Sequence, residues 1–529
     1  MKEFFSKRLP RRDVFRGSGL GFLGGFLGSF LPGSAQAAPS KGLTLGSTLY
    51  ESIGVKPLIN ARGTFTIISG STMLPEVRAT MTEAAQHHVH IDEMMAAIGA
   101  RLAELTQAEF GMVTCGCSAA ITHATAACIA GGNPDLHVRL PNLTGFAKDE
   151  VIIPRHSRNV YDAAVRAVGA KIVEASTVEE LDLAFGPRTA MIYILAGPNA
   201  ESGPLTTQVI CDMAKQRNVP VFVDAAAEIL TVPNVHLAKG ATLVAYSGGK
   251  CIRGPQTAGL LLGRKDLIQA AWVHSAPHHG YARSLKIGKE EAMGMLMAVE
   301  MWFKRDHDAE WKMWLSRLDY VAKRVAAIPG VTTSLKMPEG LSNKHPTLNI
   351  RWDPAKLGVT GRVVAKHLFT TEPRIALPTG ADDNGLSVVP YMMSKGEETI
   401  VADRLYATLT APPPAQPPAP TAAPTGDLTG RWDVHIHFLA STSQHVLHLK
   451  QREAKLEGTH QGDFLARDLA GTMNGDQIRL TSSVSENHGD SLQYEFTGTL
   501  QGDDLSGELN MGEYLGARWT AKRHTRARG

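Results

Sequence analysis

A lysine follows two glycines in the stretch Tyr246-Ser247-Gly248-Gly249-Lys250-Cys251-Ile252-Arg253-Gly254-Pro255-Gln256. This stretch follows the short apolar run Thr242–Ala245, which we expect to be a buried strand. The glycines allow a tight turn, so the lysine stands at the carboxyl end of a sheet, where open α/β sheets bind ligands. A nucleotide-binding P-loop would need glycine at position 244 and serine or threonine at position 251, but Val244 and Cys251 stand there.

A carboxylate and a glycine turn accompany this lysine. Asp224 ends the apolar run Val219–Val223, one strand–helix unit before the lysine, and a capping role is the alternative for it. Earlier in the chain, Phe110–Thr114 is expected to be a strand that leads through Gly116 and Ser118 into a helix of small residues. A glycine turn at a helix start presents free N–H groups to an anion. Together these elements predict a site for a cofactor that carries a phosphate and a ring nitrogen.

Apolar strands and helical stretches alternate from about residue 45 to residue 410. Val151–Ile153 and Ala190–Leu195 predict further buried strands, and Leu205–Arg217 predicts a helix between strands. This alternation favours βαβ units and a mainly parallel sheet. We expect a large domain over residues 45–290 and a smaller α/β domain over residues 291–410.

Further stretches are typical of one enzyme family. They are Ile59-Asn60-Ala61-Arg62-Gly63-Thr64, Leu105–Glu109, Gly116–Ala120, Val221–Ala226, Gly288–Glu291 and Glu372-Pro373-Arg374-Ile375. With the lysine stretch, they resemble the fold-type I pyridoxal-phosphate enzymes, in the branch of bacterial selenocysteine synthase and D-glucosaminate-6-phosphate ammonia-lyase. The resemblance implies an aspartate aminotransferase-like α/β large domain, an α+β small domain, and pyridoxal 5'-phosphate as the cofactor.

The resemblance also assigns roles to individual residues. Lys250 would be the Schiff-base lysine, and Asp224 would bind the pyridine nitrogen. The cofactor phosphate would be held by Gly116, Cys117, Ser118 and Ser247. His156, just past a strand, would stack on the cofactor ring, with a surface histidine as the alternative. Arg374, before a short strand of the small domain, would bind a substrate carboxylate through its planar guanidinium group.

The N-terminal residues are typical of an export signal. The pair Arg11-Arg12 precedes the apolar, glycine-rich stretch Gly17–Leu31, which leads to the cleavage pattern Ala35-Gln36-Ala37. The arginine pair resembles a twin-arginine signal, and the apolar stretch is too short to span a membrane. We predict a signal peptide over residues 1–37, export of the folded protein and a periplasmic or secreted location.

The chain changes character after residue 410. The Pro/Ala-rich segment 411–426 predicts a semi-rigid linker, and Trp432–Phe438 alternates apolar and polar residues as a half-buried strand does. A Gly-Thr-x-x-Gly-Asp pattern then occurs three times, at 458–463, 471–476 and 498–503. Each copy places a tight turn after a strand, so residues 427–529 predict a meander of hairpins that forms an all-β barrel or sandwich, faintly similar to lipocalins.

Composition excludes several partners. The formal net charge of +3 offers no field for nucleic acid. The five cysteines are odd in number and do not suggest the even disulfide framework of proteins that fold outside the cytoplasm. Cys115-Gly116-Cys117 lacks metal-ligand spacing, and Asp433, His435 and His437 are expected to form an ordinary outer strand face. We therefore expect no nucleic acid, no metal and no membrane span in the mature chain.

The predicted site suits chemistry at the α-carbon of an amino acid or amino sugar acid. Lys250 would remove the α-proton and a β-substituent would leave, giving a keto acid and ammonia, which makes a carbon–nitrogen lyase the leading hypothesis. A racemase or an aminotransferase needs the same residues and stays open. A non-catalytic exported binding protein on this scaffold is opposed by the intact Lys250 and Asp224. The resemblance also implies a homodimer or larger homo-oligomer.

Overall fold

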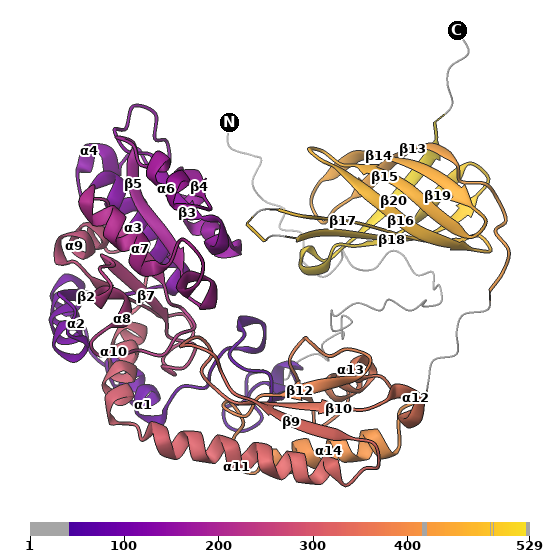
Figure 1. The fold of residues 1–529 in the computed structure, drawn as a ribbon, viewed down its shortest axis with the longest axis horizontal. Helices are drawn as coiled ribbons and strands as arrows, with labels where there is room; N and C mark the ends of the chain where they lie inside the picture. The colour runs from indigo at the N-terminus through magenta and orange to yellow at the C-terminus, as the bar shows by residue number, and fades with distance from the viewer. Residues whose placement is uncertain (1–41, 415–420, 487, 490, 525–529) are drawn as a thin grey trace, which may run out of the picture. The chain divides into compact units, whose positions relative to one another are not determined.

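The computed structural model describes residues 42–414, 421–486, 488–489 and 491–524, so the predicted signal peptide lies outside it. The chain divides into two compact units, one of residues 38–419 with 485–490 and one of residues 420–484 with 491–529. The first is an α/β unit and the second is a β-barrel (Figure 1). The α/β unit has two hydrophobic cores and the barrel has its own. Within the described ranges, no helix combines the length and apolar character that crossing a bilayer requires.

The larger core surrounds a seven-stranded sheet in the order β2-β8-β7-β6-β5-β3-β4. Its strands are β2 (Phe110–Thr114), β3 (Glu150–Pro154), β4 (Lys171–Ala175), β5 (Thr189–Leu195), β6 (Val221–Asp224), β7 (Leu243–Ser247) and β8 (Gly259–Gly263). Only β8 is antiparallel to its neighbours. Strands β5 and β6 are buried along almost their whole length, as expected of parallel strands covered on both faces. The predicted mainly parallel sheet is confirmed.

Helices connect and cover these strands. They are α1 (Pro75–Ala84), α2 (Ile91–Thr106), α3 (Cys117–Ala130), α4 (Pro134–His137), α5 (Ala163–Arg166), α6 (Val178–Ala184), α7 (Thr207–Gln216), α8 (Val235–Ala238), α9 (Lys265–Val273) and α10 (Lys289–Lys304). Helix α3 is buried on almost every side and contacts both α9 and the sheet. Its many alanines permit this close approach, because a small side chain keeps the helix near its neighbours.

The smaller core belongs to an α+β region with a three-stranded antiparallel sheet in the order β12-β10-β9. Its elements are α11 (His307–Ala326), β9 (Thr332–Lys336), β10 (Thr347–Arg351), α12 (Pro354–Leu357), α13 (Gly361–Thr370), β12 (Gly385–Val388) and α14 (Glu397–Thr410). A short parallel pair, β1 (Ile59–Asn60) with β11 (Ile375–Ala376), joins the N-terminal segment to this region. Helix α10 packs on α1 and α2, whereas α11 packs on α14, so the regions divide between α10 and α11 rather than at residue 291.

The second unit is a closed antiparallel barrel, in which each strand pairs with the next and β20 returns to β13. Its strands are β13 (Gly430–His437), β14 (Thr442–Arg452), β15 (Lys455–Gln461), β16 (Ala466–Asn474), β17 (Gln477–Ser485), β18 (Ser491–Gln501), β19 (Asp504–Asn510) and β20 (Gly516–Arg523). Two of the repeated glycines, Gly475 and Gly502, take positive φ values of 62° and 65° in the turns. Of the two predicted architectures, a barrel or a sandwich, the structure shows the barrel.

The predicted linker is shorter than residues 411–426. Ala422 donates its main-chain N–H to Asn474 Oδ1 at 2.6 Å, and Thr425 donates its own to the carbonyl oxygen of Gly475 at 3.0 Å. The last residues of this segment therefore belong to the barrel, and residues 415–420 lie outside the described part.

Candidate active site

The sheet order brings most of the predicted site residues to one edge. Asp224 ends β6. The loop that contains Lys250, called the lysine loop below, follows the neighbouring strand β7. In the sheet, only β8 lies between β7 and β2. The turn at Gly116 follows the end of β2 in the chain. His156 lies just past β3, within the 3-10 segment Arg155–Ser157. Because carboxyl ends of parallel strands share one edge, residues far apart in the sequence meet there.

Asp224 is a buried carboxylate held by three donors. Its side chain is almost fully enclosed. Oδ2 accepts the hydroxyl proton of Tyr193 at 2.9 Å, while Oδ1 accepts from the main-chain N–H of Ala226 at 3.1 Å and from the Cys117 thiol at 3.4 Å. Burial raises the pKa of Asp224, and these hydrogen bonds and the charge of Lys250 oppose that rise. No arginine, lysine or histidine in the described part of the chain forms an ion pair with it.

Tyr193 on β5 fixes the orientation of this carboxylate. Asn159 Nδ2 donates to the Tyr193 hydroxyl at 3.0 Å, and the same hydroxyl donates to Asp224. Burial and the neighbouring carboxylate raise the pKa of Tyr193 well above its ordinary value, so the phenol keeps its proton. Sequence reasoning missed Tyr193. The available signal was a hydroxyl group within an otherwise apolar strand run, 189–195.

Lys250 lies half-buried beside this group. Burial raises the pKa values of Asp224 and Cys117, and the positive charge of the nearby Lys250 opposes both rises. Within the described ranges no hydrogen bond or ion pair engages its Nζ atom. The next residue is fixed, because the Cys251 thiol donates to the carbonyl oxygen of Glu228 at 3.1 Å. The loop is thus anchored while its amine is free for chemistry.

The Gly116 turn has the shape of an anion cradle. Gly116 caps α3 with φ 85° and ψ 165°, a conformation that essentially only glycine adopts. A Cβ on Gly259 would lie 2.4 Å from the carbonyl carbon of Gly116, so β8 approaches the turn closely. The first N–H groups of α3 belong to Cys117 and Ser118 and have no acceptor within the helix. Ser118 is exposed, and Ser247 pairs with Gly259 in register, one strand away.

Two predicted residues have other partners. The thiol of Cys117 points to Asp224, so only its main-chain N–H group is available to a phosphate. Arg374 donates through Nε to the carbonyl oxygen of Phe369 at 2.9 Å and through Nη1 to that of Lys56 at 3.2 Å. These contacts anchor the segment before β11. The assignment of Arg374 to a substrate carboxylate stays a prediction.

His156 lies at the sheet edge with its ring held in place. Its Nε2 atom is 3.0 Å from the carbonyl oxygen of Leu205, and its Nδ1 atom is 3.1 Å from Ser157 Oγ. Ser157 Oγ in turn accepts from the main-chain N–H of Leu195, the β5 residue that pairs with Asp224. The ring is fixed near Asp224, and its stacking on a cofactor stays a prediction.

A cavity of about 640 Å³ lies beside the lysine loop, with Cys251 and Arg253 in its wall. Its charged lining consists of four cations and two carboxylates, Arg253, Arg305, Arg317, Lys344, Asp308 and Glu310. Arg305 and Glu310 pair through two contacts of 3.0 and 2.8 Å, so the cavity keeps an excess of positive charge. Three tryptophans and Tyr391 complete an aromatic wall. Sequence reasoning missed this cavity, although Arg253 stands within the lysine stretch.

The chain has clear relatives among characterised proteins, although no protein-family model matches it. It is 30% identical to D-glucosaminate-6-phosphate ammonia lyase of Salmonella typhimurium over 367 residues, which are 68% of this chain and 96% of that protein. The chain belongs to this family of pyridoxal-phosphate enzymes. A solved structure of D-glucosaminate-6-phosphate ammonia-lyase matches 68% of this chain and 97% of its own, with a TM-score of 0.61 and 29% identity. The predicted fold type is confirmed.

Two other relatives show how far reactions diverge around this fold. The chain is 31% identical to 5'-C-glycyluridine monooxygenase-decarboxylase of Streptomyces sp over 368 residues, which are 66% of this chain and 90% of that protein. It is 30% identical to L-seryl-tRNA(Sec) selenium transferase of Mannheimia succiniciproducens over 181 residues, 29% of this chain and 38% of that protein. The predicted branch is confirmed, and the family alone does not fix the reaction.

The residues present fit pyridoxal phosphate. Asp224 is a buried carboxylate without a cationic partner, which suits a protonated pyridine nitrogen. Gly116 keeps the start of α3 open, where a side chain would crowd an anion. Lys250 presents an amine that forms no other bond in the described structure. Asp224, Lys250 and the Gly116 turn would therefore hold the ring, the reactive carbon and the phosphate.

Proposed function

We propose that this protein is a carbon–nitrogen lyase that releases ammonia from an amino acid or amino sugar acid. One observation carries this proposal: Asp224 is buried and forms no ion pair in the described structure, and the nearby Lys250 amine has no hydrogen-bond partner there. The chain is also related over most of its α/β unit to an ammonia lyase. When bound, pyridoxal phosphate supplies an electron sink next to the substrate α-carbon.

The chain's own residues would prepare and drive the elimination. Asp224 would accept the ring N–H and keep that proton in place, while Tyr193 and the main-chain N–H of Ala226 hold the carboxylate still. The Lys250 amine would take the proton from the substrate α-carbon, because it lies beside Asp224 and is free of other bonds. Loss of a β-substituent and hydrolysis then give one keto acid for each ammonia.

The cavity beside the loop that contains Lys250 supports a proposal about the charge of the substrate. Its cations exceed its carboxylates, and burial together with Arg305 lowers the pKa of Arg253. Such a wall attracts an anion, since crowded guanidinium groups gain from a negative partner. We therefore propose that the substrate carries an anionic group, its own carboxylate at least.

Two further proposals concern the setting of the enzyme. The basic and apolar pattern of residues 1–37 supports export by the twin-arginine route to the periplasm or beyond. The fold type supports a homodimer or larger homo-oligomer, in which a small-molecule substrate is the other partner.

The reaction is tested by incubating the purified full chain, loaded with pyridoxal phosphate, with a panel of amino acids and amino sugar acids. We expect one substrate to yield ammonia and a keto acid in equal amounts. Lys250→Ala should abolish the release, whereas Lys265→Ala, at the start of α9, should leave it unchanged. Isomer exchange without ammonia would contradict the lyase and favour a racemase, and amino transfer to an added keto acid would favour an aminotransferase.

The Streptomyces relative makes oxidative decarboxylation the second candidate. A monooxygenase consumes dioxygen, whereas elimination does not. The same panel run under argon separates the two reactions. We expect ammonia release at an unchanged rate without dioxygen, and carbon dioxide formation that requires dioxygen would overturn the lyase proposal.

A further inference from the structure

The inside of the barrel carries a polar patch at one end. Consecutive strands β14 to β17 each place a buried polar residue at an inward position there, His445, His460, Arg467 and Ser482. Deeper inward positions of the same strands are apolar, for instance Leu447 and Leu469. Closing a barrel needs no such patch, because apolar side chains fill small barrels well. We call these four residues the polar wall.

The two histidines of the polar wall are neutral and joined in a chain. His460 Nδ1 lies 2.7 Å from Ser482 Oγ, and His460 Nε2 lies 2.8 Å from His445 Nδ1. Burial lowers the pKa of both rings, that of His460 to about 3. In the arrangement in which Ser482 Oγ donates to His460 Nδ1 and His460 Nε2 donates to His445 Nδ1, the neutral His445 ring carries its proton on Nε2. The Asp463 carboxylate, 3.6 Å from that atom, favours this arrangement.

Arg467 is the charged member of the polar wall. It lies directly opposite His460 in register and is only 8% exposed. Its Nε and Nη1 atoms are buried without a hydrogen-bond partner, and no ion pair engages it within the described residues. Asp463 stands on the adjoining turn but is 55% exposed and accepts from Ser443 Oγ at 2.6 Å. The hydrogen bond from Ser443 lowers the pKa of Asp463, and the charges of His445 and Arg467 add to that lowering, so this carboxylate lies within the field of Arg467. A buried guanidinium group with unused N–H donors is costly, so an anion at these donors would stabilise the barrel.

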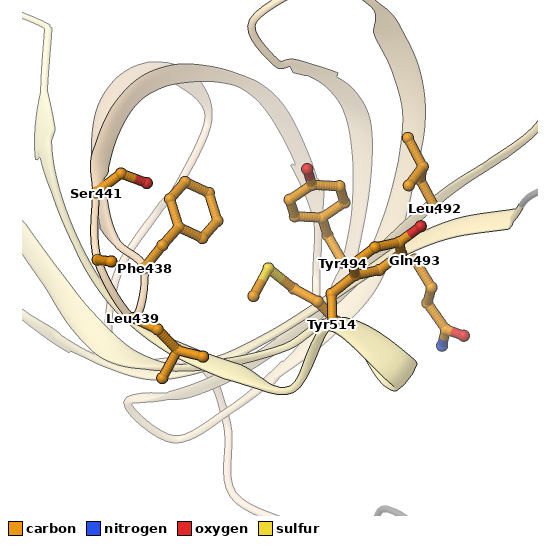
Figure 2. Close-up of a pocket in the computed structure, with 9 residues that line it drawn as sticks. Phe438, Leu439, Ser441, Leu492, Gln493, Tyr494 and Tyr514 are labelled. Carbon is orange, nitrogen blue, oxygen red and sulfur yellow. The ribbon is translucent and has the colours of Figure 1, made fainter. Parts of the chain in front are cut away.

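An apolar cavity opens at the same end of the barrel. It has a volume of about 380 Å³, which falls within the range of small-molecule sites. Its lining includes Phe438, Leu439, Leu492, Tyr494, Met511 and Tyr514. Figure 2 shows the rings of Phe438 and Tyr494 on either side of the opening. The ring centre of Tyr494 also lies 4.9 Å from the Arg467 guanidinium group, so the cavity adjoins the polar wall at Tyr494.

We propose that the barrel binds a small amphipathic carboxylic acid. Its carboxylate would pair with Arg467 and accept from His445 Nε2, and its apolar part would lie among Phe438, Tyr494 and Met511. A single buried guanidinium charge beside neutral histidines matches one negative charge, which favours a carboxylate over a dianionic phosphate. This site is separate from the Lys250 site and does not rest on the proposed reaction.

The ligand's charge is tested first, since this needs no variant. Decanoate and its uncharged isostere decanamide are titrated into the full-length protein by calorimetry. We expect decanoate to bind once per chain and at least tenfold more tightly than decanamide. Equal affinities, or no binding of decanoate, would overturn the proposal. Tighter binding of decyl phosphate than of decanoate would overturn the choice of a carboxylate.

The place of binding is tested with a matched pair of variants. Arg467→Met should reduce decanoate affinity to the level of decanamide. Arg518→Met, an outward-facing arginine on β20, should leave it unchanged. Circular dichroism and thermal unfolding show whether each variant folds, and Ser441→Trp, which fills the cavity mouth, provides a second blocking variant. Unchanged affinity in folded Arg467→Met and Ser441→Trp proteins would contradict the site.

Discussion

Asp224 is the single residue on which the proposed chemistry depends most. Its carboxylate is buried, is held by Tyr193 and forms no ion pair with any described residue. A hydrogen bond to a charged group contributes about 1.5–3 kcal/mol, or roughly 10- to 100-fold in affinity. We therefore expect Asp224→Asn to weaken pyridoxal-phosphate binding by that factor and to abolish ammonia release. Equilibrium titration of the apoprotein, followed by absorbance, measures the change.

A matched control separates this effect from a general loss of acid groups. Asp212 is exposed on α7, so Asp212→Asn should leave cofactor affinity unchanged. Cofactor affinity in Asp224→Asn equal to that of the original protein would mean that this carboxylate does not contact the ring.

At the residue scale, the sequence places Lys250 and Asp224 at strand ends, and the structure brings these two positions to one edge of the sheet. Lys250 follows two glycines after a strand, and Asp224 ends the strand before it, so both could be found without coordinates. Tyr193 could not, because a tyrosine in a buried strand is usually packing. The carbonyl groups that Arg374 binds could not be predicted either, since an arginine before a strand gives no sign of them.

The start of α3 is the element that we propose binds the cofactor phosphate. Gly116 holds a backbone conformation that costs other residues about 1–3 kcal/mol. Gly116→Ala should therefore twist the first turn and weaken cofactor binding at least tenfold. At the other end of α3, Gly131 has φ 57° and open space around its Cα. Gly131→Ala should reduce stability by about 1 kcal/mol and leave cofactor affinity intact. Equal effects of both variants on affinity would contradict the cradle.

The polar wall makes the stability of the barrel depend on pH. The pKa of His460 falls from an ordinary 6.5 to about 3 in the folded barrel. Between these values the unfolded chain binds a proton that the folded barrel does not, so stability falls as pH falls from 6.5 towards 3. One pKa unit is worth about 1.4 kcal/mol, so acidification from pH 6.5 to 4 should cost about 3 kcal/mol through His460.

Urea unfolding at pH 7 and pH 4 tests this. His460→Gln should remove much of the acid sensitivity of the barrel transition. His435→Gln, at an exposed position on β13, should not change it. His445 and Arg467 face His460 and shift its titration as well, and both are kept in these variants. An identical pH dependence in the original protein and His460→Gln would exclude the histidine as the cause.

Strands and helices were predicted well where apolar residues form continuous runs. They were predicted less well where only packing contacts show which region an element belongs to. Strands β3, β5, β6 and β7 were expected within two residues of their observed bounds. The boundary between α10 and α11 was missed, because both are amphipathic helices and only their contacts assign one to each region. The polar wall was also missed, since its members lie on four strands and converge only when the barrel closes.

At the scale of the whole molecule, the two units have separate hydrophobic cores. Units with separate cores unfold as separate cooperative transitions. We expect two transitions in differential scanning calorimetry, of which pyridoxal phosphate raises only the α/β one and decanoate only the barrel one. A single transition raised by both ligands would show that the units unfold together.

Pyridoxal phosphate is expected to be bound covalently at Lys250. Borohydride reduction of the loaded protein, followed by peptide mass spectrometry, shows which residue carries the cofactor. We predict that the cofactor mass appears on the peptide that contains Lys250 and on no other, and that Lys250→Ala protein carries none. A protein that gains no cofactor mass, or gains it on another residue such as Lys344, would rule out covalent binding at Lys250.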